Sequence, residues 1–403
     1  MFRLDRIEAL EVLDTDSRIP YVRRRGEYLY NFWRDGANPR GLWRRTTLDS
    51  YRTDEPEWDV LIDIDALAAV DGENWVWAGA DVIEPDLTLA LISLSRGGAD
   101  ATVVREFDLR TRKFVEDGFN LPEAKTSITW EGADSVLVGT DFGPGSLTDS
   151  GYPRIVKRWR RGQALAEAAT LFEGSASDVS VGAGYDPTPG YERLFISRST
   201  DFFNREYYEL RGEQPVLVEV PTDASISAHR EWLLIRPRTD WQVGSTLHPA
   251  GSLLAAKYDE FLTGTAELTV VFEPDAHTSL ESFSWTRDRL ILLTLADVAS
   301  RLEITTPGSW HREPVAGIPP NTNTVIVDVD EYGDEIFVDC SGFTVPSRLL
   351  WGHAGESLVE VKSAPSFFDA TDLAVSQHFV ASADGTLDPG HIEFSFRGAD
   401  RFE

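Results

Sequence analysis

A serine nucleophile in a hydrolase typically stands in the pattern Gly-x-Ser-x-Gly, where a sharp strand-to-helix turn exposes its hydroxyl to a neighbouring base. That pattern does not occur in this sequence. The nearest fragment, Gly355-Glu356-Ser357-Leu358-Val359, lacks the second glycine, and we interpret it as an ordinary turn between two strands. The sequence therefore offers no serine with the local context that this chemistry needs.

Histidine is the side chain that most often acts as a general base or a metal ligand. The seven histidines are His229, His248, His277, His311, His353, His378 and His391. No two of them stand three or four residues apart, the spacing that brings a pair onto one face of a helix, so a zinc-binding helix is excluded. Histidines far apart in sequence could still meet in a folded channel, but we interpret each one as a satisfied loop or surface residue.

The single cysteine, Cys340, follows the apolar run Ile336-Phe337-Val338-Asp339. A lone cysteine in such a run is typical of a small buried side chain, and a reactive thiol is the alternative. An internal disulfide requires two cysteines. The absence of disulfides favours a cytoplasmic location.

Two glycine-rich stretches and two acidic clusters remain as candidate binding loops. Arg96–Asp100 joins two apolar runs, which predicts a hairpin turn. Asp141–Ser146 and Asp149–Pro153 form one long loop after a strand and lack the following helix of a phosphate-binding loop. The clusters Asp54–Glu57 and Asp328–Glu331 lack the glycine and the terminal glutamate of a calcium loop, so we interpret them as solvated turns. We therefore assign no catalytic, cofactor-binding or metal-binding residue.

Charge and hydropathy limit the partners of the chain. Its 403 residues include 38 basic and 67 acidic side chains, giving a net charge of −29, and 42% are hydrophobic, enough for a large core. A field this negative repels phosphate backbones, and the arginine clusters are too scattered to form a nucleic-acid-binding stripe. Those clusters are Arg23-Arg24-Arg25, Arg44-Arg45, Arg158 and Arg160-Arg161. No apolar run reaches the length of a membrane span, and we expect no secretory signal behind Met1–Arg6.

Short alternating apolar runs bounded by Gly, Pro, Asp or Asn recur along the whole chain, which predicts a mostly β structure. Clear examples are 27–33, 59–64, 88–94 and 231–236. Helix is expected near 3–13, with short helical turns at 65–70 and 258–263.

The strands group into seven units with a period of roughly 40 to 50 residues. The units are about 20–66, 74–121, 125–175, 178–221, 224–274, 277–318 and 322–362. About four strands per unit at this period is typical of a β-propeller. A sandwich or barrel would force the chain into two domains, and no Pro/Gly/Ser-rich linker divides it. We predict an all-β, seven-bladed propeller of four-stranded antiparallel blades, with six or eight blades as the margin of error.

Several short motifs resemble one known family. They are Tyr28–Asp35, Pro39–Thr47, Asn74–Trp77, Ser93–Asp100, Gly139–Gly143, Ser150–Arg154 and Gln377–Thr386. Together they resemble the propeller domain of the prolyl oligopeptidase family of serine peptidases, over about residues 18–386. The resemblance implies a propeller that caps an α/β-hydrolase domain and admits short peptides, which are cut after proline.

The departures from that family concern its catalytic half. The resemblance implies that the Ser-Asp-His triad lies wholly after the propeller, so no catalytic residue can be carried over to this sequence. We expect 1–19 to be a remnant of the helical N-terminal segment of the family, 20–386 to be the propeller, and 387–403 to be a tail that leaves the family pattern. Leu387–Phe396 does not look like the first hydrolase strand of the family.

Three functions remain open. The first is a gating propeller that is non-catalytic by itself and belongs with a separate α/β-hydrolase domain or with short proline-containing peptides. The second is a free-standing module that binds a peptide or protein on one propeller face. The third is an enzyme built independently in the propeller channel.

Overall fold

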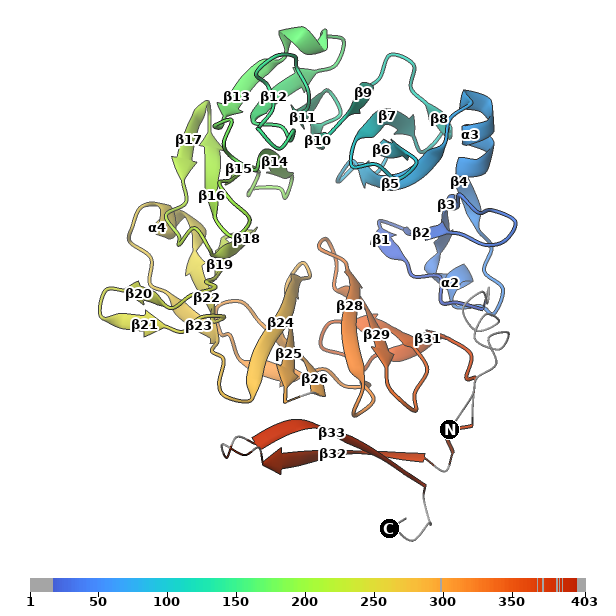
Figure 1. Cartoon of the computed structure of the whole chain (residues 1–403), viewed down its shortest axis with the longest axis vertical. Coiled ribbons are helices and arrows are strands. Elements are labelled where there is room, and N and C mark those ends of the chain that lie inside the picture. Colours follow the sequence, from blue (N-terminus) through green and yellow to red (C-terminus); the bar gives the residue numbers. More distant parts are fainter. Residues whose placement is uncertain are drawn as a thin grey trace. The chain divides into compact units, whose positions relative to one another are not determined.

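The structure is a computed structural model that describes residues 17–396 except 298, 368, 372, 382, 384 and 386. It is mostly β and forms a seven-bladed β-propeller of mainly four-stranded antiparallel sheets, as the sequence predicted (Figure 1). The helix expected at 3–13 lies outside the described residues.

Each blade is one sheet of consecutive strands, and each strand pairs with the next. Blade 1 contains β1 (Arg23–Arg25), β2 (Tyr28–Trp33), β3 (Leu42–Thr47) and β4 (Asp59–Asp63). Blade 2 contains β5 (Trp75–Val82), β6 (Leu89–Arg96), β7 (Thr102–Asp108) and β8 (Lys113–Phe114), and β9 (Leu121–Ala124) also pairs with β7. Blade 3 contains β10 (Ser127–Gly132), β11 (Ser135–Gly139), β12 (Ile155–Arg160) and β13 (Ala169–Glu173).

The remaining blades repeat this order, with one insertion. Blade 4 contains β14 (Ser180–Asp186), β15 (Arg193–Ser199), β16 (Arg205–Arg211) and β17 (Gln214–Leu217). Blade 5 contains β18 (Ser225–His229), β19 (Trp232–Arg236), β22 (Leu253–Lys257) and β23 (Thr269–Phe272), with the hairpin β20 (Trp241–Val243) and β21 (Thr246–His248) between β19 and β22. Blade 6 contains β24 (Thr278–Trp285), β25 (Leu290–Ala296), β26 (Ala299–Thr305) and β27 (Arg312–Pro314). Blade 7 contains β28 (Asn323–Val329), β29 (Glu335–Ser341), β30 (Arg348–His353) and β31 (Val359–Ser363).

A separate hairpin follows the blades. It pairs β32 (Leu373–Ala381) with β33 (Leu387–Phe396), and their register places His378 opposite His391. The two strands lie on either side of residue 386, at which we expected the family pattern to end.

Short helices fill some connections between strands. They are α2 (Leu48–Tyr51), α3 (Ile64–Asp71), α4 (Tyr258–Leu262) and the 3-10 turn η1 (Leu165–Glu167). The sequence predicted α3 and α4 but not α2, which is a single turn. The Asp63 side chain caps α3 by accepting a hydrogen bond from the backbone N–H of Ala66, and Gly72 ends the helix at a positive φ of 68°.

The hydrophobic core lies between neighbouring blades. Side chains on the second strand of a blade enter opposite cores in turn, because a strand alternates its two faces. Val136 and Val138 of β11 pack with blade 2, whereas Leu137 packs with blade 4. A strand covered on both sides must be apolar at every position, which explains the continuous run Leu290–Leu293 in β25.

Contacts within the chain divide it into two compact units. One comprises Met1–Phe32, Arg45–Asp59 and Pro274–Glu403, and the other comprises Trp33–Arg44 and Val60–Glu273. The first unit therefore holds blades 6 and 7 with part of blade 1, and the second holds blades 2 to 5.

Candidate functional site

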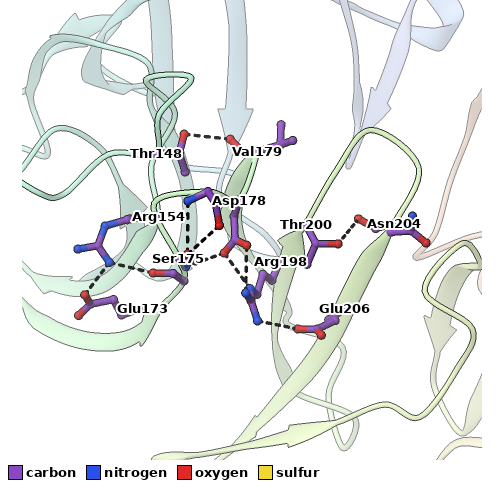
Figure 2. Close-up of polar contacts among 12 residues, drawn as sticks. Thr148, Arg154, Glu173, Ser175, Asp178, Val179, Arg198, Thr200, Asn204 and Glu206 are labelled. Carbon is purple, nitrogen blue, oxygen red and sulfur yellow. Dashed lines mark hydrogen bonds and ion pairs between the residues drawn. The ribbon is translucent and has the colours of Figure 1, made fainter.

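Three loops of blades 3 and 4 meet in a polar cluster, which we call the loop cluster (Figure 2). They are residues 140–154 between β11 and β12, 174–179 between β13 and β14, and 200–204 between β15 and β16. Strands alternate in direction within these antiparallel sheets, so β11, β13 and β15 all end at the same end of their blades. A backbone hydrogen bond from Asp149 to Ala176 joins the first two loops, and one from Val179 to Ser199 joins the second loop to the end of β15, where the third loop begins.

An ion pair between Asp178 and Arg198 forms the centre of the loop cluster. The Arg198 Nε donates to Asp178 Oδ2 at 2.8 Å and its Nη2 donates to Oδ1 at 3.0 Å. The backbone N–H of Ser175 donates to the same carboxylate at 2.7 Å, and Arg198 Nη1 donates to Glu206 Oε2 at 3.1 Å. Hydrogen bonds from Arg198 hold the pKa of Asp178 below its usual range, and the same bonds raise the pKa of Arg198. Both groups stay charged at neutral pH, so Asp178 orders the loops and is not a general acid there.

Gly174 permits the second loop to fold closely around the Asp178 carboxylate. A Cβ at this position would lie 2.6 Å from Asp178 Oδ2 and 2.6 Å from Val181 Cγ2, too close for any side chain. Arg154 holds the same turn from the first loop, because its Nη1 donates to Glu173 Oε1 at 2.6 Å and to the Gly174 carbonyl at 2.8 Å. The loop cluster is therefore a rigid junction between two blades.

The long glycine-rich loop 140–154 satisfies its own polar groups. The Ser146 hydroxyl accepts from the backbone N–H of Phe142 at 2.9 Å and donates to the Gly143 carbonyl at 2.7 Å. The backbone N–H of Gly143 donates to Asp141 Oδ1 at 2.8 Å. Strand β12 follows this loop, which confirms the prediction of a loop between two strands.

The short loop 200–204 exposes two aromatic side chains that the sequence reasoning missed. Phe202 is 89% exposed and Phe203 is 66% exposed. The sequence signal was Asp201-Phe202-Phe203-Asn204, a turn-forming aspartate and asparagine around two large apolar residues.

A second polar group lies in the other unit, where blade 1 meets blade 7. We call it the seam, and it consists of Tyr21, Arg24, Asp328, Glu335 and Asp339. The backbone N–H of Arg24 in β1 donates to Asp328 Oδ2 at 2.5 Å, and its Nη2 donates to Glu335 Oε1 at 3.4 Å. The Tyr21 hydroxyl donates to Asp339 Oδ2 at 2.8 Å. The described sheets of blades 1 and 7 share no strand, and each of these contacts involves at least one side chain.

The seam corrects the interpretation of Asp328–Glu331 as a solvated turn at Asp328, whereas Glu331 is exposed in a turn as predicted. Asp328 lies in strand β28 and is partly buried against β1. Burial raises the pKa of Asp328 to about 6, although the hydrogen bond from the Arg24 backbone acts in the opposite direction. Burial, followed by the hydrogen bond to Asp339, raises the pKa of Tyr21 to about 12. Sequence alone could not show that Arg23–Arg25 would face this aspartate from 304 residues away.

The side chains considered for catalysis do not form a nucleophile and base pair in the described part of the chain. Ser357 is exposed in the turn between β30 and β31, as predicted. Cys340 is fully buried in the core between blades 6 and 7, and burial raises the pKa of its thiol. This confirms the buried-side-chain interpretation. The Asp54–Glu57 cluster is exposed at Asp54, Glu55 and Glu57, as expected for a solvated turn.

The histidines lie on different elements, and two of them correct the prediction. His229 and His248 are buried in blade 5 rather than in surface loops, and His248 contacts the ring of Trp241. His277 is exposed, with its Nδ1 2.9 Å from Asp297 Oδ1. His311 and His353 are exposed. His378 in β32 lies opposite His391 in β33 in the register of the terminal hairpin. The three- or four-residue spacing used to search for histidine pairs applies to helices and could not detect this pair.

Two further observations concern ligands and membranes. Among the described residues, no group of three or more His, Cys, Asp or Glu side chains could hold a metal ion. Within the same part of the chain, no helix has the length and apolar character of a membrane span.

Residues 3–353 match the family model described as the prolyl oligopeptidase N-terminal β-propeller domain. The chain belongs to the prolyl oligopeptidase family. This confirms the resemblance drawn from the motifs of blades 1 to 3, and the remaining motif, Gln377–Thr386, lies beyond the residues that match the family model.

Curated relatives extend the match. The chain is 36% identical over 401 residues to an uncharacterized peptidase of Sinorhizobium fredii and 30% identical over 394 residues to one of Rickettsia prowazekii. These matches cover 95% and 93% of this chain but 54% of each relative. The chain therefore spans about half the length of the curated relatives that it matches.

Solved structures also match nearly all of this chain but only a little over half of their own length. A post-proline cleaving enzyme from Rickettsia typhi matches with a TM-score of 0.85 at 29% identity, over 94% of this chain and 57% of that one. Oligopeptidase B from Leishmania major matches with a TM-score of 0.69 at 16% identity, over 94% of this chain and 53% of that one, which is a likeness of fold alone.

Proposed function

We propose that this chain is the substrate-gating propeller of a prolyl oligopeptidase-type peptidase and that it is non-catalytic by itself. The observation that carries the proposal is the family propeller match over 351 of the 403 residues, 3–353, in a chain that spans about half of its relatives. The chemistry would belong to an α/β-hydrolase domain, which normally accompanies this propeller in the family. Its substrates would be short peptides cut after proline, as the family resemblance implies.

The physical basis of gating is the channel of a propeller. Blades packed around an axis restrict the width of the passage between them, so a propeller can select peptides by size without chemistry of its own. Interdigitated cores between blades 2 and 3 and between blades 3 and 4 hold these blades together. A rigid blade wall is what exclusion by size requires. A cytoplasmic location stays a prediction.

The test is hydrolysis of a chromogenic peptide with proline before the scissile bond. The chain alone should give a rate equal to that of buffer, because binding without a nucleophile and base does not supply the reaction. The chain should then be co-produced with the part of the Sinorhizobium fredii relative that lies outside the match. We expect this pair to cut peptides of about ten residues and to spare an unfolded protein chain. Equal cleavage of both substrates would refute gating, and serine-inhibitor-sensitive activity of the chain alone would refute its non-catalytic assignment.

A free-standing interaction module is the second candidate, favoured by the exposed pair Phe202 and Phe203. This function requires that the chain bind a peptide or protein without any hydrolase domain. Failure to associate with the hydrolase part, together with saturable binding of a peptide, would favour it.

A further inference from the structure

The loop 200–204 holds two adjacent phenylalanines in solvent. Phe202 and Phe203 are 89% and 66% exposed, at the end of blade 4 where its strand β15 finishes. A phenylalanine side chain that becomes covered removes about 150 to 250 Å² from water, so two neighbouring exposed rings are a strong potential contact. Contiguous exposed apolar surface on a folded protein typically marks an interaction site.

The loop is pre-organised. Asp201 Oδ1 accepts from the backbone N–H of Phe203 at 2.7 Å and of Asn204 at 2.8 Å, and these bonds lower the pKa of Asp201. The Thr200 backbone N–H donates to the Asn204 carbonyl at 3.1 Å, and the Thr200 hydroxyl contact with Asn204 is visible in Figure 2. Thr222 Oγ1 donates to Asn204 Oδ1 at 2.7 Å and so ties the loop to the connection between blades 4 and 5. A loop already fixed in one conformation loses little entropy when a partner covers it.

A positive charge lies beside the aromatic pair. The guanidinium of Arg238, which follows β19 in blade 5, lies 5.2 Å from the centroid of the Phe203 ring. Arg238 is itself exposed. We call Phe202, Phe203 and Arg238 the aromatic patch. A complementary surface would offer an apolar pocket with a carboxylate at its edge, since aromatic and arginine side chains are the usual anchors of protein interfaces.

We propose that the aromatic patch is the anchor by which this propeller docks an α/β-hydrolase domain, an inference that rests on the proposed function. Two observations favour this occupant. The relatives carry nearly as much chain again beyond the part that matches this propeller. A second copy of this chain would bring another net charge of −29 toward the first, which opposes self-association.

The test compares the F202S/F203S variant with the wild-type chain. The probe is the part of the Sinorhizobium fredii relative that lies outside the match, co-produced with each form. Association is measured by co-purification and then by titration of the purified components. We expect the double variant to bind at least tenfold more weakly. The L217S variant is the matched control, because Leu217 lies in β17 at the outer edge of the same blade and is 43% exposed. It should bind like the wild type.

Two further variants separate contact from folding. D201A keeps both rings but removes the acceptor that orders them, so we expect binding roughly threefold weaker with an unchanged melting temperature. F202L/F203L keeps apolar side chains and should restore most of the affinity.

The outcomes distinguish the docking surface from the proposed function. If the wild type binds the hydrolase part and F202S/F203S binds equally well, the aromatic patch is refuted while the proposed function stands. If the wild type does not bind it, both fail. If F202S/F203S instead abolishes a concentration-dependent dimer of this chain in sedimentation, the occupant is a second copy and the inference is wrong.

Discussion

Replacing Asp328 by asparagine should stabilise the protein at neutral pH. The carboxylate is partly buried between β28 and β1, and burial raises its pKa from 3.8 to about 6. A tenfold change in an acid dissociation constant is worth about 1.4 kcal/mol, so the ionised group destabilises the fold by about 3 kcal/mol at pH 7.5. Asparagine carries no charge, and its carbonyl can still accept the hydrogen bond from the Arg24 backbone.

The sign of the pH dependence follows from the raised pKa. Above about pH 6 the carboxylate is ionised in both the folded and the unfolded chain, and the folded state bears the full cost of burying the charge. As the pH falls from about 6 to about 4 the folded state takes up the proton first, so this contribution to stability recovers. Carboxylates with lowered pKa values, such as Asp178, lose their contribution to the free energy of unfolding only at more acidic pH. The range from pH 4.5 to 7.5 is therefore the one in which the effect of Asp328 can be measured.

The assay is thermal unfolding of the wild type and D328N across that window. A stabilisation of about 3 kcal/mol in a chain of this length should raise the melting temperature by about 3 °C at pH 7.5. The difference should fall to about 1 °C at pH 4.5, where the folded carboxyl group is protonated but the unfolded one is still mostly ionised. D134N is the control, because it removes the same charge from a side chain that is 96% exposed. A variant that melts below the wild type at pH 7.5, or a difference that does not change with pH, would refute the reasoning.

Three further predictions concern the loop cluster and the buried thiol. R198A should lower the free energy of unfolding by about 1 to 3 kcal/mol, because it leaves the buried Asp178 carboxylate without its guanidinium partner. The measurement is a denaturant titration, and an unchanged midpoint would contradict the prediction. G174A should lower the free energy of unfolding by about 1 to 3 kcal/mol in the same titrations, since its methyl group would overlap the Asp178 carboxylate. The control G184A has open space at its Cβ and should lower this free energy much less. Similar midpoints for the two alanine variants would contradict this account. Cys340 should react with a thiol-specific chromogenic disulfide only after denaturation, because its side chain is fully buried and the pKa of its thiol is raised. Rapid labelling of the native chain would contradict this prediction.

The fold followed from local sequence patterns because each blade is built from neighbouring strands. Alternation and turn residues at 27–33 or 88–94 report the strands β2 and β6 directly, and the repeat of these groups reports the number of blades. The turn at Gly97-Gly98 was predictable for the same reason, since both residues adopt positive φ values of 66° and 86°. Helix α2 was missed because its single turn, Leu48–Tyr51, is shorter than a helical period can reveal.

The sequence by itself determined the β class, the seven-blade repeat and the family, because short-range hydrophobic periodicity and local motifs encode all three. Only the tertiary structure decided which charged groups meet. Asp328 and Arg24 are 304 residues apart, and nothing in either local pattern predicts that β28 and β1 lie together. Likewise, Asp178 read alone is an ordinary loop aspartate, yet Arg198 of the next blade keeps it ionised. The burial and charge of a side chain depend on what the fold brings against it, so these properties follow from the packing of blades and not from neighbours in the chain.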